Sequence, residues 1–564
     1  MEALDWIVIG AFALALIGII VWVVKQKQND SADYFLGGRD ATWIAIGASI
    51  FASNIGSEHL IGLAGAGASS GMAMAHWEIQ GWMILILGWV FVPFYSRSMV
   101  YTMPEFLERR YNPQSRTILS VISLVSYVLT KVAVTVYAGG LVFQQVFGIK
   151  ELWGIDFFWI AAIGLVVLTA LYTIFGGMKS VLYTSVLQTP ILLLGSLIIL
   201  VLGFKELGGW DEMMRVCGAV TVNDYGDTMT NLIRSNDDAN FPWLGALIGS
   251  AIIGFWYWCT DQFIVQRVLS GKNEKEARRG TIFGAYLKLL PVFLFLIPGM
   301  IAFALHQKYI GAGGEGFLPM LANGTANADA AFPTLVAKLL PAGVKGLVVC
   351  GILAALMSSL ASLFNSSAML FTIDFYKRFR PETPEKKLVG IGQIATVVIV
   401  ILGILWIPIM RSVGDVLYTY LQDVQSVLAP GIAAAFLLGI CWKRTSAQGG
   451  MWGLIAGMII GLTRLGAKVY YSNAGEVADS TFKYLFYDMN WLFFCGWMFL
   501  FCIIVVIVVS LATEAPTAEK IQGLVFGTAT KEQKAATRAS WDHWDIIHTV
   551  IILAITGAFY WYFW

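Results

Sequence analysis

Long apolar runs are the feature of this sequence that most restricts its fold. The stretches DWIVIGAFALALIGIIVWVV (residues 5–24) and WLFFCGWMFLFCIIVVIVVSLA (residues 491–512) contain a single charged residue between them, Asp5. A helix of about 20 apolar residues is long enough to cross roughly 30 Å of hydrocarbon. The 564-residue chain is only 13% charged, whereas average soluble domains are about 25% charged. The sequence therefore predicts an all-α polytopic membrane protein.

About fourteen spans of roughly 20 to 30 residues are predicted. The first apolar run has no basic leader and no small-residue cleavage site, so we interpret it as a span and not as a signal peptide. The net charge of +1, with basic residues spread over loops, gives no indication of nucleic-acid binding. The six cysteines and five histidines show neither a disulfide framework nor metal-ligand spacing. The spans are expected to begin near residues 5, 42, 76, 117, 155, 180, 241, 281, 344, 388, 415, 448, 490 and 545.

The distribution of Lys and Arg predicts the orientation of these spans. With the N-terminus outside, most of the 37 basic residues fall in loops on the inner side, as the positive-inside rule requires. We expect one transport domain with peripheral helices. Its parts are a first span and inner loop (1–41), a first repeat of spans two to six (42–204), an outer loop (205–240), a second repeat of spans seven to eleven (241–445) and three C-terminal spans (446–564).

Two predicted spans are interrupted by glycine and polar residues. The segment ASNIGSEHLIGLAGAG (52–67) carries Asn54, Glu58 and His59, and FPWLGALIGSAIIGFWYWCTDQF (241–263) lies five spans later. Small residues at such spacing also permit close helix packing. Discontinuous helices at corresponding positions of two halves are typical of transporters with inverted repeats, whose substrate site lies between them. This pattern favours two broken helices facing a central site.

Ionisable residues inside apolar spans indicate where that site lies. Each such residue costs about 2.5–3.5 kcal/mol or more unless it is paired or hydrated. Those that fall within spans are Glu58, Glu78, Lys131, Asp261, Lys288 and Asp423. Such groups either pair to hold helices together or bind substrate. Carboxylates, ammonium groups, amides and aromatic faces together suit a hydroxyl-rich solute. The candidate substrate-binding residues are Asn54, His59, Glu78, Tyr257, Trp258, Lys288 and Gln422.

The ninth span, GILAALMSSLASLFNSSAMLFT (351–372), carries small and hydroxyl residues on one face. Helix packing accounts for this stripe, but Ser358 and Ser359 are adjacent hydroxyls. Hard cations prefer oxygen ligands, and a broken helix offers free carbonyl groups. A neutral oxygen site of this kind suits sodium better than a proton.

Several long stretches resemble the sodium:solute symporter family, in particular its sodium/glucose cotransporter branch, over nearly the whole chain. The stretches are DYFLGGRD (33–40), IGASIFASNIGSEHLIGLAGAG (46–67), WYWCTDQFIVQRVLSGKN (256–273), YLKLLP (286–291), LAALMSSLASLFNSSAMLFTIDFY (353–376) and WKRTSAQGGMWGL (442–454). The resemblance implies a five-plus-five inverted-repeat core like that of the leucine transporter.

The resemblance also implies roles for individual residues. Sodium would be held by the carbonyls of Ala52 and Ile55, completed by Ala355, Ser358 and Ser359. Five of the candidate residues fall where the family hydrogen-bonds a hexose: Asn54, His59, Glu78, Lys288 and Gln422. Tyr257 falls where an aromatic inner gate stacks on the ring, beside Trp258. Some members bind a second sodium through a hydroxyl at the position of Ala361 and a carboxylate at that of Ser185. Because both ligands are absent here, we expect one sodium per sugar.

The resulting expectation is sodium-coupled symport of glucose or galactose into the cell by alternating access, with sodium as the co-transported ion. Myo-inositol or another polyol is the alternative solute, and a membrane sensor or passive channel on the same fold is the alternative class. We find neither a nucleophile–base pair nor a phosphate-binding loop in the sequence, so we do not expect an enzyme. The expected partners are hexose, sodium and the lipid bilayer of the plasma or inner membrane. The sequence is also compatible with a homodimer.

Overall fold

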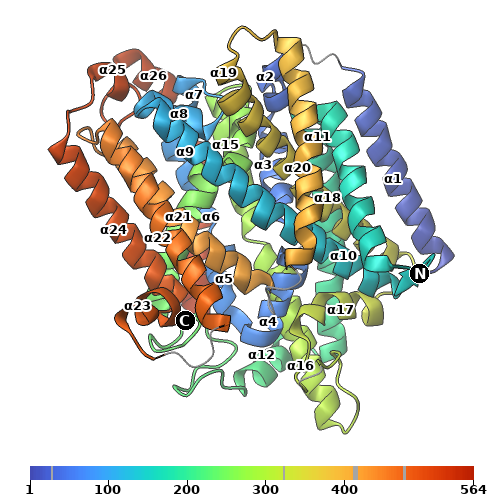
Figure 1. The fold of residues 1–564 in the computed structure, drawn as a ribbon. Coiled ribbons are helices and arrows are strands. Elements are labelled where there is room, and N and C mark those ends of the chain that lie inside the picture. The colour runs from blue at the N-terminus through green and yellow to red at the C-terminus, as the bar shows by residue number, and fades with distance from the viewer. Residues whose placement is uncertain (27–29, 57, 322–323, 411–416, 474–477) are drawn as a thin grey trace.

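The computed structural model is a bundle of helices (Figure 1). It describes residues 1–564 except 27–29, 57, 322–323, 411–416 and 474–477. Within the described part, one two-stranded antiparallel sheet is present, formed by β1 (Glu151–Leu152) and β2 (Ile155–Asp156). The all-α class expected from the sequence is confirmed.

The helices up to residue 218 include α-helical, 3₁₀ and π segments. They are α1 (Ala3–Val24), α2 (Ser31–Leu36), η1 (Gly37–Arg39), α3 (Trp43–Asn54), η2 (Glu58–Leu63), α4 (Ala64–Ser70), η3 (Gly71–Met74), α5 (Ala75–Glu78), α6 (Gly81–Ile86), η4 (Leu87–Phe91), α7 (Val92–Ser98), α8 (Met103–Arg110), α9 (Pro113–Ser126), η5 (Tyr127–Val132), α10 (Ala133–Phe147), α11 (Phe157–Leu207) and α12 (Trp210–Gly218).

The remaining helices follow the outer loop. They are α13 (Trp243–Gly254), η6 (Phe255–Thr260), α14 (Gln262–Leu269), α15 (Glu274–Lys288), η7 (Val292–Leu296), α16 (Ile297–Gly311), η8 (Ala328–Ala330), α17 (Ala331–Leu339), α18 (Val344–Met369), η9 (Leu370–Tyr376), α19 (Lys377–Phe379), α20 (Glu385–Met410), α21 (Leu417–Cys441), α22 (Ala447–Asn473), α23 (Thr481–Lys483), η10 (Tyr484–Asp488), α24 (Trp491–Ala512), α25 (Ala518–Ile521), α26 (Lys531–Ala539) and α27 (His543–Tyr562).

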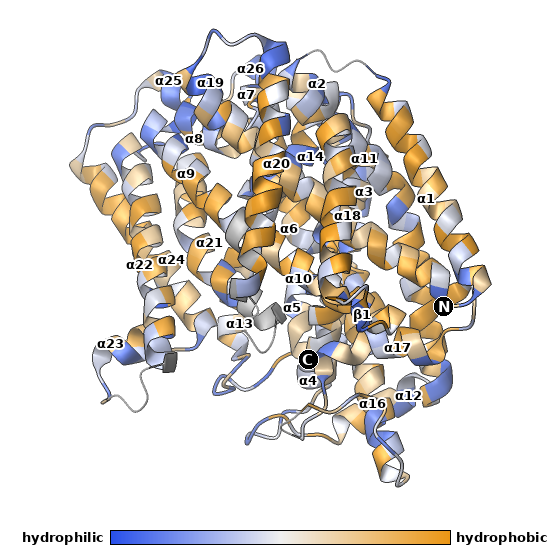
Figure 2. Ribbon diagram, turned by 45° about the vertical axis from the view of Figure 1, so that its right-hand side comes forward, coloured by the Kyte–Doolittle hydropathy of each residue, from blue (hydrophilic) through white to orange (hydrophobic). Residues whose placement is uncertain are grey.

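Eleven helical stretches of the described chain are long and apolar enough to cross a membrane. Hydrophobic residues colour the outer faces of helices such as α1, α20 and α24, whereas hydrophilic segments gather at the two ends of the bundle (Figure 2). This arrangement is that of a multi-pass membrane protein, with apolar side chains facing lipid along the middle of the bundle.

The difference between eleven stretches and the fourteen expected spans has structural causes. α11 is assigned as one helix of 51 residues, but its backbone turns at Gly177, which has φ +51° and ψ −147°. A Cβ at this position would clash with the carbonyl oxygen of Tyr34, so a glycine is needed there. Two shorter apolar helices, Trp43–Asn54 and Ala133–Gln144, also fall below the length of a complete span. The span expected near residue 415 begins partly outside the described residues, and α21 is described from Leu417.

The two segments expected to be broken are both interrupted. α3 ends at Asn54, Ile55 is extended with φ −80° and ψ 105°, and the chain becomes helical again as the π-helix η2. In the second segment, α13 runs into the π-helix η6, Asp261 is extended with φ −77° and ψ 126°, and α14 follows. π-Helical segments are frequent at functional sites. Each interruption leaves backbone groups without partners in the same helix.

The inner loops expected from the positions of Lys and Arg lie together. The short helices α2, α8, α19, α25 and α26 share one end of the bundle, at the top of Figure 1. The labelled N- and C-termini lie toward the other end. The basic loops therefore occupy one face of the molecule, as the predicted topology requires.

Candidate functional site

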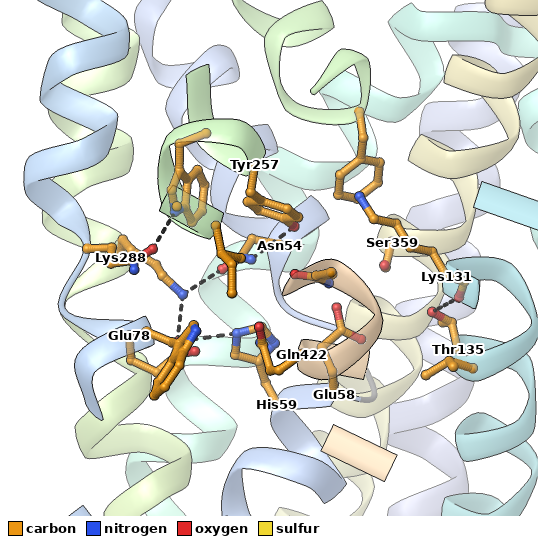
Figure 3. A pocket seen from close by; sticks show the side chains of 18 of the residues that line it. Asn54, Glu58, His59, Glu78, Lys131, Thr135, Tyr257, Lys288, Ser359 and Gln422 are labelled. Atoms are coloured by element: carbon orange, nitrogen blue, oxygen red, sulfur yellow. Dashed lines mark hydrogen bonds and ion pairs between the residues drawn. The ribbon is translucent and has the colours of Figure 1, made fainter. Parts of the chain in front are cut away.

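A polar cavity lies between the two interrupted helices. Its volume is about 60 Å³, which accommodates several water molecules. Figure 3 shows that side chains from η2, α5, η6, α15, α18 and α21 point into it. The lining residues are Asn54, Glu58, His59, Trp77, Glu78, Gln80, Lys131, Val134, Thr135, Ile253, Gly254, Tyr257, Trp258, Phe263, Lys288, Ser359, Leu363, Gln422 and Gln425.

All seven candidate substrate-binding residues line this cavity, and Lys288 organises most of them. Its Nζ donates to the Oε2 of Glu78 at 2.6 Å and to the Oδ1 of Asn54 at 3.0 Å. The ammonium also lies 5.4 Å from the centre of the Trp258 ring. Glu78, Asn54 and Lys288 are all buried. Because a buried charge is costly unless paired, this network compensates both ionic groups while leaving polar atoms facing the cavity.

His59 and Gln422 extend the network across the cavity. The Nε2 of His59 lies 3.3 Å from the Oε2 of Glu78, the same oxygen that accepts from Lys288 (Figure 3). Gln422, from α21, is buried, and its Oε1 has no hydrogen-bond partner among the described residues. A buried amide oxygen of this kind is available to a donor group of a solute.

Tyr257 connects the second interrupted helix to the first. Its hydroxyl accepts a hydrogen bond from the Nδ2 of Asn54 at 3.1 Å. The neighbouring Trp258 donates through Nε1 to the Oε1 of Gln80 at 3.3 Å. In turn, the Nε2 of Gln80 donates to the carbonyl of Ser250 at 2.8 Å. Both aromatic rings are thereby held beside the polar groups of the cavity.

A second buried ion pair lies at another part of the cavity wall. The Nζ of Lys131 donates to the Oδ2 of Asp261 at 2.6 Å, and the hydroxyl of Tyr127 donates to the Oδ1 of the same carboxylate. Four aromatic rings surround the ammonium within 5.3 Å of their centres, an arrangement that stabilises a cation. The rings belong to Tyr127, Trp256, Tyr257 and Phe263.

The candidate sodium ligands lie on two helices that pack together. Ala52 and Ile55 lie at the end of α3, and Ala355, Ser358 and Ser359 lie on α18. A 2.6 Å hydrogen bond between the hydroxyls of Ser53 and Ser362 joins the two helices. All five candidate ligands are buried, and Ser359 also faces the cavity. Hydroxyl and carbonyl oxygens near one helix end form a suitable donor set for a hard monovalent cation.

Ser185 contacts this group of residues. Its hydroxyl lies 3.3 Å from that of Ser358 and donates to the carbonyl of Val181 at 2.6 Å. Ala361 is buried on α18 and offers no side-chain oxygen. The one-sodium stoichiometry expected from these two residues stays a prediction.

The structure adds cavity residues that the sequence did not single out as binding groups. Gln80, Thr135 and Gln425 line the cavity beside the expected set. Gln425 follows Gln422 by three residues on α21, so the two amides share one face of the helix. This spacing could have predicted Gln425 as a cavity residue from the sequence. The sequence pattern could not have predicted Gln80 as a cavity residue, because the position of its side chain depends on contacts with α13 and η6.

Interrupted helices that enclose a buried polar cavity in a multi-pass bundle define a membrane transporter. The model of the sodium:solute symporter family matches residues 34–457. The chain is 36% identical to the human sodium/myo-inositol cotransporter 2 over 542 residues, covering 94% of this chain and 79% of the relative. It is 37% identical to the dog sodium/myo-inositol cotransporter over 551 residues, covering 93% of this chain and 76% of that relative.

The chain therefore belongs to the sodium:solute symporter family. Its fold is similar to that of a Na⁺-coupled sialic acid symporter in a substrate-bound, outward-open state, with a TM-score of 0.72 and 22% identity. That likeness covers 92% of this chain and 99% of the solved chain. The protein is a sodium-coupled solute symporter and not an enzyme.

Proposed function

We propose that this protein transports myo-inositol or a closely related polyol together with sodium. The observation that carries the proposal is the Lys288–Glu78–Asn54 network in a cavity between two interrupted helices. It occurs in a chain 36% identical to a sodium/myo-inositol cotransporter over 94% of its length. The identity supports the solute class, and the cavity supplies the chemistry to bind it.

The cavity matches a neutral solute that carries many hydroxyl groups. Glu78 accepts hydrogen bonds, Lys288 donates them, and Asn54 and Gln422 do both. Since the Glu78–Lys288 pair is compensated within the protein, a neutral solute would enter without leaving either charge unpaired. A solute carboxylate would be repelled by Glu78. These groups favour a polyol over an acid.

A hexose is the second candidate, because two aromatic side chains lie beside these polar groups. Tyr257 and Trp258 are held at the cavity by hydrogen bonds to Asn54 and Gln80. Aromatic faces cover the C–H surface of a pyranose ring. The hexose expected first from the sequence has no counterpart among the names of the relatives described above, so it takes second place.

Sodium binding at the end of α3 would be coupled to solute binding through residues that serve both sites. Ala52 and Ile55 belong to the same helix end as Asn54. A sodium ion that orders this end would also position Asn54 for the solute, and two ligands that prefer one conformation increase each other's affinity. We propose one sodium per solute, a five-plus-five inverted-repeat core, an outside N-terminus and a plasma or inner membrane location.

Uptake into proteoliposomes tests this function. Radiolabelled myo-inositol, glucose and galactose would be compared with and without an inward sodium gradient. We expect sodium-driven accumulation of myo-inositol, reduced about 100-fold or more in Glu78→Gln and unchanged in Glu212→Gln, a matched change at a surface carboxylate paired with Arg215. Accumulation of glucose but not myo-inositol would assign the hexose, and uptake independent of sodium would overturn symport.

A further inference from the structure

One carboxylate of the cavity has a different environment from the others. Glu58 is the first residue of η2, directly beyond the interruption of the first broken helix. Its side chain is half-buried and lines the cavity. Figure 3 shows its carboxylate between His59 and Lys131, across the cavity from Lys288. Glu58 is therefore placed to contact a solute on the side opposite the Glu78–Lys288 pair.

The other two carboxylates of this region are compensated by nearby ammonium groups. Glu78 pairs with Lys288 at 2.6 Å, and Asp261 pairs with Lys131 at 2.6 Å. Among the described residues, Glu58 has no ion pair within 4 Å and no hydrogen bond to another side chain, although its carboxylate lies near its own backbone N–H. The ammonium of Lys131 and the imidazole of His59 lie farther from it. An ionised carboxylate can only accept hydrogen bonds, so this one suits a donor group of a solute.

The local backbone leaves room for this carboxylate. A Cβ at Gly56 would clash with the carboxylate of Glu58. The glycine at the interruption therefore allows the Glu58 side chain to lie back over the break and face the cavity. The position of the carboxylate is a consequence of how the first helix is broken.

We infer that Glu58 is a specificity-determining residue that favours a cyclitol over a pyranose. This inference rests on the proposed polyol transport. A cyclitol such as myo-inositol carries a hydroxyl on every ring carbon, so it can donate to Glu78 and to Glu58 on opposite sides at once. A pyranose has a ring oxygen, which only accepts, at one of these positions, so fewer of its orientations present hydroxyls to both carboxylates. A site built to accept from a hydroxyl rejects an analogue that lacks it.

The half-saturation concentrations of myo-inositol and glucose would be measured in proteoliposomes for the wild type, Glu58→Gln and Glu58→Asp. For myo-inositol, we expect Glu58→Gln to raise this concentration about 10-fold or more, as for loss of a hydrogen bond to a charged acceptor. For glucose, the change should be below about 3-fold, and Glu58→Asp should recover part of the myo-inositol affinity. The maximal rate and the sodium half-saturation concentration should stay within about 2-fold. Equal changes for both solutes, or a change in maximal rate alone, would overturn the inference.

Monodeoxy-inositols provide a second measurement that does not depend on the folding of a variant. In the wild type, removal of the hydroxyl that Glu58 accepts from should weaken competition with labelled myo-inositol about 10-fold. That deoxy compound and the parent should compete equally in Glu58→Gln. If every monodeoxy compound competes as well as the parent in the wild type, Glu58 does not accept a hydrogen bond from the solute and the inference is wrong. If the wild type shows no sodium-driven myo-inositol uptake at all, the proposed function itself fails, which is a separate result.

Discussion

The two interrupted helices differ in how the protein satisfies the backbone groups that each interruption releases. At the second interruption, the carboxylate of Asp261 caps α14 by accepting from the N–H of Phe263 at 3.2 Å. The hydroxyl of Tyr95 donates to the carbonyl of Cys259 at 2.6 Å. At the first interruption, no side chain of the described residues donates to the carbonyls of Ala52 or Ile55.

This difference indicates that the two interruptions serve different purposes. Unpaired carbonyls are costly in a membrane unless a ligand or water satisfies them. The first interruption therefore has carbonyl oxygens available for a cation. At the second interruption, the carboxylate of Asp261 caps the following helix and pairs with Lys131. Sodium is expected at the first interruption, while the second contributes aromatic side chains to the solute cavity.

The largest expected effect is at the second interruption, on stability. Asp261→Asn would leave Lys131 buried without its counter-charge, and breaking one side of a buried ion pair costs about 3–5 kcal/mol. Thermal unfolding in detergent should show a greatly lowered midpoint. Asp542→Asn is the control, because its pair with Arg279 is partly exposed and exposed ion pairs contribute little to stability. If Asp261→Asn unfolds at the same midpoint as the wild type, this carboxylate does not stabilise the second interruption.

The next effect is at the first interruption and concerns ion affinity instead of stability. Ser359→Ala removes a hydroxyl from the candidate sodium site, and we expect the sodium half-saturation concentration to rise about 10- to 100-fold. The unfolding midpoint should change little. Ser367→Ala, at a buried serine farther along α18, should leave sodium dependence unchanged. Equal sodium dependence in both variants would argue against a sodium site on α18.

Both interruptions could be predicted from the sequence, because glycine and polar residues inside an apolar span favour a helix that is broken beside a cavity. The sequence also placed Glu58, Glu78, Lys131, Asp261 and Lys288 inside spans. It did not predict which of these charges pair, since the partners are separated by 130 residues in one case and 210 in the other. Pairing at that separation depends on how whole helices pack.

The number of spans was harder to predict for a related reason. Hydropathy detects apolar length, but a turn at Gly177 depends on the close approach of Tyr34. The family resemblance supplied the roles of the site residues, and the cavity brings all seven candidate substrate-binding residues together. Their roles in binding stay predictions until the variants are measured.

A smaller effect is expected where the first broken helix meets the segment between α16 and α18, which includes η8. Burial raises the pKa of Asp329 to about 6, against about 3.9 in an unfolded chain. Asp329 packs against α4 so closely that a Cβ at Gly65 would clash with its carboxylate. The folded state binds the proton more tightly, so stability falls as the pH rises through this range, by about 1 kcal/mol between pH 5 and 7.

Unfolding midpoints of the wild type and Asp329→Asn at about pH 5 and pH 7 test this sign. The asparagine variant should lose less stability than the wild type over this interval, and Asp224→Asn, in the outer loop 205–240, serves as the control. A wild type that gains stability as the pH rises, relative to Asp329→Asn, would contradict the assignment.

The smallest effect concerns the hydrogen bond that joins the two interruptions. Tyr257→Phe removes the acceptor for the Nδ2 of Asn54, and a neutral hydrogen bond contributes about 0.5–1.5 kcal/mol. We expect the solute half-saturation concentration to rise about 3-fold at saturating sodium. Sodium increases the affinity for solute by one factor, and solute increases the affinity for sodium by another. Because binding coupling is reciprocal, both factors should fall by the same amount in this variant. Tyr286→Phe, whose hydroxyl bonds to His548 away from the cavity, should change neither factor. If Tyr257→Phe weakens solute binding but leaves both factors intact, the two interruptions communicate by another route, and Asn54 acts on the solute alone.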